Sequence, residues 1–145
     1  YGDPVAIPVR AWNRLRRLCT GRSQPGYTHQ WRDERFQGWR KRLMASTHGR
    51  EETLLAWSMG WRTFRTGNDV MEREVICPAS EAGGYKSTCE KCGLCNGKAD
   101  SHDNRKSIVI PAHGSGGKVQ RIQRINLAGE SMRRPAARTP PKQAL

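Results

Sequence analysis

The chain has 145 residues, a length that suits one domain with a modest core, and its 26 Lys and Arg against 13 Asp and Glu give a formal net charge of +13. No apolar run approaches the roughly 18 residues that a membrane helix needs, which excludes the transmembrane class. All ten Trp, Tyr and Phe residues occur within the first 85 positions, which excludes a fully disordered chain.

The first part of the chain alternates between predicted helices and strands. Apolar residues at three- and four-residue spacing predict a helix from Pro8 to about Cys19, with Cys19 on the buried side as a core residue. Residues 26–31 have the aromatic and β-branched content of a short strand. Asp33 is suited to cap a helix that ends near Arg42.

The alternation continues towards the centre of the chain. Residues 43–46 predict a strand, and residues 51–60 a helix that begins with two glutamates and ends at a glycine. Strands are predicted at residues 61–65, 74–77 and 107–110, and the tryptophans are interpreted as core residues with surface arginines beside them. Alternation of this kind predicts an α/β fold, a mainly parallel sheet with covering helices.

Composition divides the chain near residue 113. Residues 1–113 are interpreted as an α/β domain that includes a cysteine-rich metal-binding insert at 77–106. Residues 114–145 are interpreted as a flexible, basic and disordered tail, because a Gly-Ser-Gly-Gly linker is followed by arginines and prolines. Within this tail, residues 118–127 are compatible with a short basic helix or a last strand.

Four of the five cysteines lie within nineteen positions and carry the strongest chemical signal: Cys77, Cys89, Cys92 and Cys95. No sign of export is present, so metal binding in a reducing cytoplasm explains them better than disulfides do. A C-x2-C turn presents two thiolates to a tetrahedral metal, and Gly93 supplies the left-handed conformation that follows such a turn.

The identity of the metal has two interpretations. Zinc is favoured, and a closed shell of four thiolates has no open position for water, so it predicts a structural role. The alternative is an iron–sulfur cluster, because three closely spaced thiols and a separate Cys-Pro also occur in bacterial ferredoxins.

Positive charge is concentrated at the two ends of the chain. Residues 1–50 hold eleven Lys and Arg and three acids, residues 114–145 hold seven and one, and the residues between hold eight and nine. This distribution predicts a polyanionic partner, nucleic acid or a nucleoprotein. The candidate contact residues are Arg14, Arg16, Arg17, Arg40, Lys41, Arg42, Arg121 and Arg124.

Several short strings resemble a family of phage and plasmid proteins that has no established activity. They are Tyr1-Gly2-Asp3-Pro4, residues 26–31, Met44-Ala45-Ser46, residues 60–65 and Cys77-Pro78-Ala79-Ser80 with the thiol run, and the resemblance covers about residues 1–114. It implies a longer parent protein, consistent with a start at Tyr1, and a barrel-like α/β fold distantly similar to radical-enzyme barrels. The C-x3-C-x2-C cluster signature of those enzymes does not occur in this sequence.

Two functions follow from these patterns. The first is a noncatalytic protein of a phage or mobile element, stabilised by a metal site of four cysteines and binding nucleic acid through its basic ends. The alternative is an iron–sulfur enzyme, or a fragment of a larger barrel-type enzyme, with a pocket near His29, Ser46 and Arg65 at the strand ends. His29, Asp33 and Ser46 are of residue types suited to an acid–base group.

Overall fold

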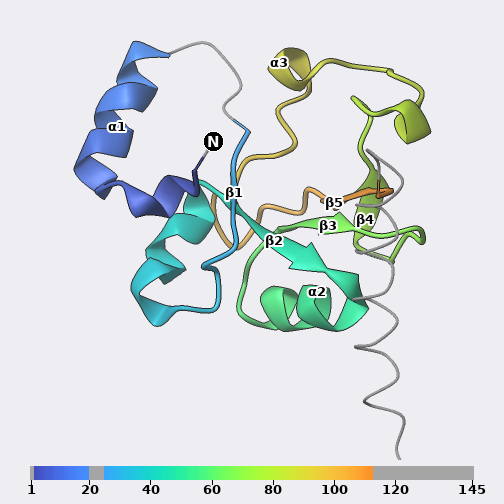
Figure 1. Cartoon of the computed structure of the whole chain (residues 1–145), viewed down its shortest axis with the longest axis horizontal. Helices are drawn as coiled ribbons and strands as arrows, with labels where there is room; N and C mark the ends of the chain where they lie inside the picture. The colour runs from blue at the N-terminus through green and yellow to red at the C-terminus, as the bar shows by residue number, and fades with distance from the viewer. Residues whose placement is uncertain (1, 20–24, 113–145) are drawn as a thin grey trace, which may run out of the picture. The chain divides into compact units, whose positions relative to one another are not determined.

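The computed structural model describes residues 2–19 and 25–112, and its strands form one five-stranded sheet (Figure 1). All four strand pairings are parallel, as the alternation of elements predicts. The strands are β1 (Tyr27–Thr28), β2 (Met44–His48), β3 (Thr63–Thr66), β4 (Glu74–Ile76) and β5 (Ser107–Ile110). The α/β class with a mainly parallel sheet is therefore confirmed.

Helices connect the strands near the predicted positions. The α-helices are α1 (Val9–Leu18), α2 (Gly49–Ser58) and α3 (Cys89–Cys92), and the 3₁₀ helices are η1 (Pro4–Ala6), η2 (Glu34–Lys41) and η3 (Glu81–Gly83). Asp33 caps η2 as predicted, because its carboxylate accepts a hydrogen bond from the Arg35 amide at 2.9 Å. The predicted helix after Asp33 is thus present as a 3₁₀ helix.

The strand order is β1-β2-β3-β5-β4, so the last strand lies between two earlier ones. In a barrel of successive βα units, strands that are consecutive in sequence are neighbours. The β3, β4 and β5 order departs from that rule, and the described strands form an open sheet.

One core lies on the sheet face that α2 covers. Trp31, Trp39 and Trp61 are buried there together with Ala45 of β2 and Ala56 of α2. The Trp31 indole donates a hydrogen bond to the Ser46 carbonyl at 3.0 Å, which satisfies its polar atom inside the core. The interpretation of these tryptophans as core residues is confirmed.

A second core lies on the opposite face of the sheet. Met44, Cys77 and Ile108 are buried there, and Leu94 and Cys95 pack against them. Strand residues alternate between faces, so Met44 and its neighbour Ala45 belong to different cores. Figure 1 shows α2 on one side of the sheet and the segment that contains α3 on the other. Residues 77–106, which contain four of the cysteines and are called the cysteine segment below, therefore form the second covering layer of the sheet.

Helix α1 departs from its expected packing. Only Trp12 of this helix reaches the first core, where it meets the Trp39 ring edge-on at a centroid distance of 5.9 Å. Leu15 and Leu18 are 51% and 77% exposed, and Cys19 is exposed as well. The prediction of Cys19 as a core residue is wrong, because the helix contacts the core through a single turn.

The predicted linker and basic tail lie outside the described residues. Among the residues that the structure describes, no helix has the length and apolar character needed to cross a membrane.

Candidate metal and nucleic-acid sites

The cysteine segment begins at the end of β4. Cys77 is buried directly after this strand, and its amide donates to the Val109 carbonyl of β5 at 2.9 Å. Cys89 and Cys92 are the first and last residues of α3. Gly93 follows with a φ of 64°, so the left-handed conformation predicted after the C-x2-C turn is confirmed.

Cys95 returns the segment to the sheet. Its side chain packs against the core that contains Cys77, and its carbonyl accepts a hydrogen bond from the Gly26 amide, just before β1, at 3.0 Å. Cys95 thus contacts both the core that contains Cys77, the residue after β4, and the loop before β1.

The four cysteines of the segment interact electrostatically. Burial raises the pKa of the Cys95 thiol to about 12, with further contributions from Cys77, Cys92 and Cys89, whereas Arg62 acts in the opposite direction. All four are free thiols. In residues 2–19 and 25–112, no group of three or more His, Cys, Asp or Glu side chains has an arrangement that holds a metal ion as it stands.

Arg62 is a buried cation that ties the cysteine segment to β3. Its side chain is 4% exposed and donates to the carbonyls of Asn96 at 2.6 Å, Lys106 at 2.6 Å and Arg105 at 3.2 Å. No carboxylate of the described residues lies within ion-pair distance of it. Burial, and secondarily the charge of Arg105, lowers the pKa of Arg62 to about 10.

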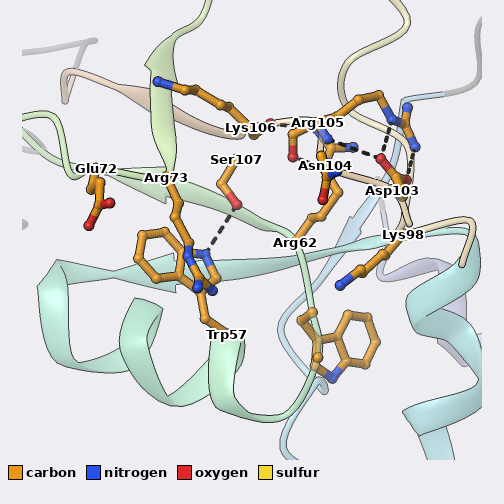
Figure 2. Close-up of a pocket in the computed structure, with 12 residues that line it drawn as sticks. Trp57, Arg62, Glu72, Arg73, Lys98, Asp103, Asn104, Arg105, Lys106 and Ser107 are labelled. Carbon is orange, nitrogen blue, oxygen red and sulfur yellow. Dashed lines mark hydrogen bonds and ion pairs between the residues drawn. The ribbon is translucent and has the colours of Figure 1, made fainter. Parts of the chain in front are cut away.

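A cleft of about 370 Å³ opens beside Arg62 (Figure 2). It lies where β3 and β5 begin, since it includes the residues directly before these strands. Five of its side chains are cationic and two are acidic. Its lining residues are Trp57, Gly60, Trp61, Arg62, Glu72, Arg73, Lys98, Asp103, Asn104, Arg105, Lys106 and Ser107.

One acidic residue of the cleft is already neutralised. The Asp103 carboxylate, 5% exposed, accepts hydrogen bonds from Arg105 Nε at 2.8 Å and Nη2 at 2.6 Å, and from the Ala99 amide at 2.9 Å. These contacts, chiefly the one with the Arg105 side chain, hold the pKa of Asp103 well below its usual range. The positive charge of the cleft therefore comes from its other cations, because Arg105 and Asp103 neutralise each other.

A second hollow adjoins the cleft, and the two share Gly60 and Lys98. Arg40 and Lys41, at the end of η2, line it. We call the cations of the two hollows the amino-edge cations: Arg40, Lys41, Arg62, Arg73, Lys98, Arg105 and Lys106.

The residues expected to bind nucleic acid are divided among several places. Arg40 and Lys41 line the second hollow, and Arg42 is half-buried just before β2. The exposed residues Arg14, Arg16 and Arg17 belong to α1. Arg121 and Arg124 lie outside the described residues.

The amino-edge cations of the central segment were missed by reasoning from the sequence. Arg62, Arg73 and Lys106 each stand directly before a strand. Parallel strands all begin at the same edge of a sheet, so basic residues that precede them collect there. The signal that could have found the cleft was therefore the position of each basic residue relative to the predicted strands.

The proposed acid–base group is brought together only in part. His29 Nε2 and Ser46 Oγ are 3.1 Å apart, whereas Asp33 pairs with Arg35 at 2.6 Å. Arg65, expected near a pocket, is 1% exposed and pairs with the buried Glu74 at 2.6 Å. Arg65 thus has a structural partner.

Comparison of the chain with protein-family models, with curated proteins and with solved structures found no match.

Proposed function

We propose that the chain is a noncatalytic nucleic-acid-binding protein in which Cys77, Cys89, Cys92 and Cys95 hold one structural zinc ion. The observation that carries the proposal is the group of amino-edge cations. Three of them, Lys98, Arg105 and Lys106, belong to the cysteine segment itself. The resemblance to phage and plasmid proteins supports an origin on a mobile element.

The metal assignment is supported by the packing of the cysteines. Cys77 after β4 and Cys95 before the loop to β5 belong to the same core, and the Cys95 thiol also interacts with Cys89 and Cys92 of α3. A zinc ion needs its four sulfurs at about 2.3 Å, which requires the thiols to close around it. The buried guanidinium of Arg62 supplies positive charge that offsets the net negative charge of a tetrathiolate centre.

The nucleic-acid assignment is supported by cations that face solvent without an acidic partner. In the described part of the chain, neither Arg73 nor Lys98 makes an ion pair, and both line the cleft. Lys41, at the second hollow, makes none there either. Lys and Arg side chains that are not neutralised within the protein are the groups that bind phosphates.

Elemental analysis and a visible spectrum of the purified protein test the metal assignment. We expect one zinc per chain and a colourless solution. The Cys92→Ser variant should lose the zinc and unfold at a temperature lower by about 10 °C or more, because structural zinc contributes folding free energy. The control is Cys19→Ser, which removes an exposed thiol outside the segment. A brown protein with iron and labile sulfide would instead support the iron–sulfur alternative and its enzymatic interpretation.

Fluorescence anisotropy with a labelled oligonucleotide tests the nucleic-acid assignment. We expect the logarithm of the binding constant to fall linearly with the logarithm of the NaCl concentration. Each phosphate contact contributes roughly 0.7 to this slope for a single strand and 0.9 for a duplex. Binding that does not respond to salt, or no binding at low salt, contradicts the assignment.

A further inference from the structure

We propose that the cleft beside Arg62 is a phosphate-binding site, with Arg73 and Lys98 as its principal ligands. The inference rests on the proposed function in one respect: a nucleic-acid strand is the source of the phosphate. The shape of the cleft, the charges that face it and the way in which its side chains are held all support such a site.

The size of the cleft suits part of a polymer. Its volume of about 370 Å³ is at the lower end of the range for small-molecule sites. It shares Gly60 and Lys98 with the second hollow of about 290 Å³, which is lined by two more cations, Arg40 and Lys41, and by one carboxylate, Asp100. A strand that leaves one phosphate in the cleft can place a neighbouring one beside Arg40 and Lys41.

Arg73 is held in place before any ligand binds. Its guanidinium carbon lies 5.7 Å from the centroid of the Trp57 ring, and Figure 2 shows the side chain over that ring. The ring is itself fixed, because the Trp57 indole donates to Thr63 Oγ1 and to Ser107 Oγ, both at 3.1 Å. A fixed guanidinium loses less conformational entropy when it binds a phosphate.

Lys98 faces the same space from the other side. Its amide donates to the Arg40 carbonyl at 2.7 Å, which anchors the base of the side chain. In Figure 2 the Lys98 side chain points from its loop towards the segment that carries Arg62, whereas Arg73 and Trp57 lie on the other side of that segment in this view. Arg73 and Lys98 thus line the cleft from different loops, the one before β4 and the one before β5.

The acidic residues of the cleft do not cancel these charges. Asp103 is paired with Arg105, as described above. Glu72 is exposed, and Figure 2 shows it on the far side of Arg73 from Lys98. The buried Arg62 in the wall has no carboxylate partner among the described residues, and its guanidinium is held by three backbone carbonyls.

Two charge-removing variants and one matched control test the site. Arg73→Gln and Lys98→Gln should each weaken oligonucleotide binding by about threefold to tenfold at low salt and lower the salt slope by roughly 0.7 for a single strand or 0.9 for a duplex. Lys86→Gln removes the same charge from an exposed residue that lines neither hollow, and it should change the slope less.

NMR titrations detect binding at the cleft directly, and the titration with inorganic phosphate does so without an oligonucleotide. Adding inorganic phosphate, and separately the oligonucleotide, should shift the indole N–H signal of Trp57, and the shift should be reduced in Lys98→Gln. If the strand binds equally well to both cleft variants and to Lys86→Gln, the cleft proposal is overturned and the proposed function stands.

Failure of the proposed function gives a different result from failure of the cleft proposal. If the oligonucleotide does not bind, the proposed function is overturned, and the phosphate titration alone then decides whether the cleft binds phosphate. A Trp57 signal that moves with neither probe overturns the cleft proposal.

Discussion

Gly97 joins the cysteine segment to the edge of the sheet. It is buried against the end of η2, and a Cβ at this position would overlap the Arg40 carbonyl oxygen and the Arg42 amide nitrogen. The next residue, Lys98, bonds to the same carbonyl. The absence of a side chain at residue 97 therefore lets the segment approach the backbone that carries Arg40 and Lys41.

We predict that Gly97→Ala lowers the free energy of unfolding by about 1–3 kcal/mol, because backbone atoms on both sides must move apart to accept the methyl group. Gly38→Ala is the matched control, since a Cβ there meets nothing within 4 Å. Urea denaturation of the two variants measures the difference. Equal stability of both would show that the close approach at Gly97 is not needed.

The burial of two arginines could not be predicted from the sequence. Arg62 stands beside Trp61, and that pattern suggested a surface position for it, whereas Arg65 was expected near a pocket. Both are buried, because their partners come from distant positions: three backbone carbonyls of residues 96–106 for Arg62, and Glu74 for Arg65. Burial of a charge depends on partners that only the tertiary structure brings near.

Most of the helices and strands, and two of the local features at their ends, could be predicted from the sequence. Strands and helices alternate in clear periodic patterns up to residue 66, and the cap at Asp33 and the turn at Gly93 depend only on local chemistry. These features were predicted because short-range sequence determines them. The C-x2-C spacing likewise locates the candidate metal residues, while the closure of a metal site stays a prediction.

Two features of the elements could not be derived in this way. The amphipathic pattern of α1 indicates an apolar face but not how much of it the remainder of the fold covers, and only Trp12 packs against the core. The position of β5 between β3 and β4 depends on how a connection of about thirty residues crosses the sheet. Connection length alone does not determine the order of strands.

For the whole molecule, counting the charges in each segment of the sequence did not locate the positive surface at the amino edge. The central part of the chain is nearly neutral in sequence, yet several of its acids are consumed in ion pairs: Glu52 with Arg32, Asp69 with Arg50 and Arg65, Glu74 with Arg65, and Asp103 with Arg105. Of the cations in this segment that make no ion pair in the described part of the chain, four lie at the amino edge and two, Lys86 and Lys91, line neither hollow; the four are Arg62, Arg73, Lys98 and Lys106. A neutral segment thus contributes a positive surface.

This distribution allows the contacts of each basic region to be measured separately. We predict that the double variant Arg40→Gln/Lys41→Gln lowers the single-strand salt slope by roughly 1.4, since each phosphate contact contributes about 0.7. Arg121→Gln/Arg124→Gln tests the expectation that the end of the chain contributes in the same way, and Arg14→Gln/Arg17→Gln tests α1.

Contacts at separate regions should be additive, because the release of counterions depends on the number of phosphates neutralised. The three slope changes, measured by anisotropy in the full chain, should therefore sum to the change in the combined variant. If the Arg40/Lys41 variant leaves the slope unchanged while the Arg121/Arg124 variant accounts for the loss, the amino edge is not the interface and the strand binds elsewhere.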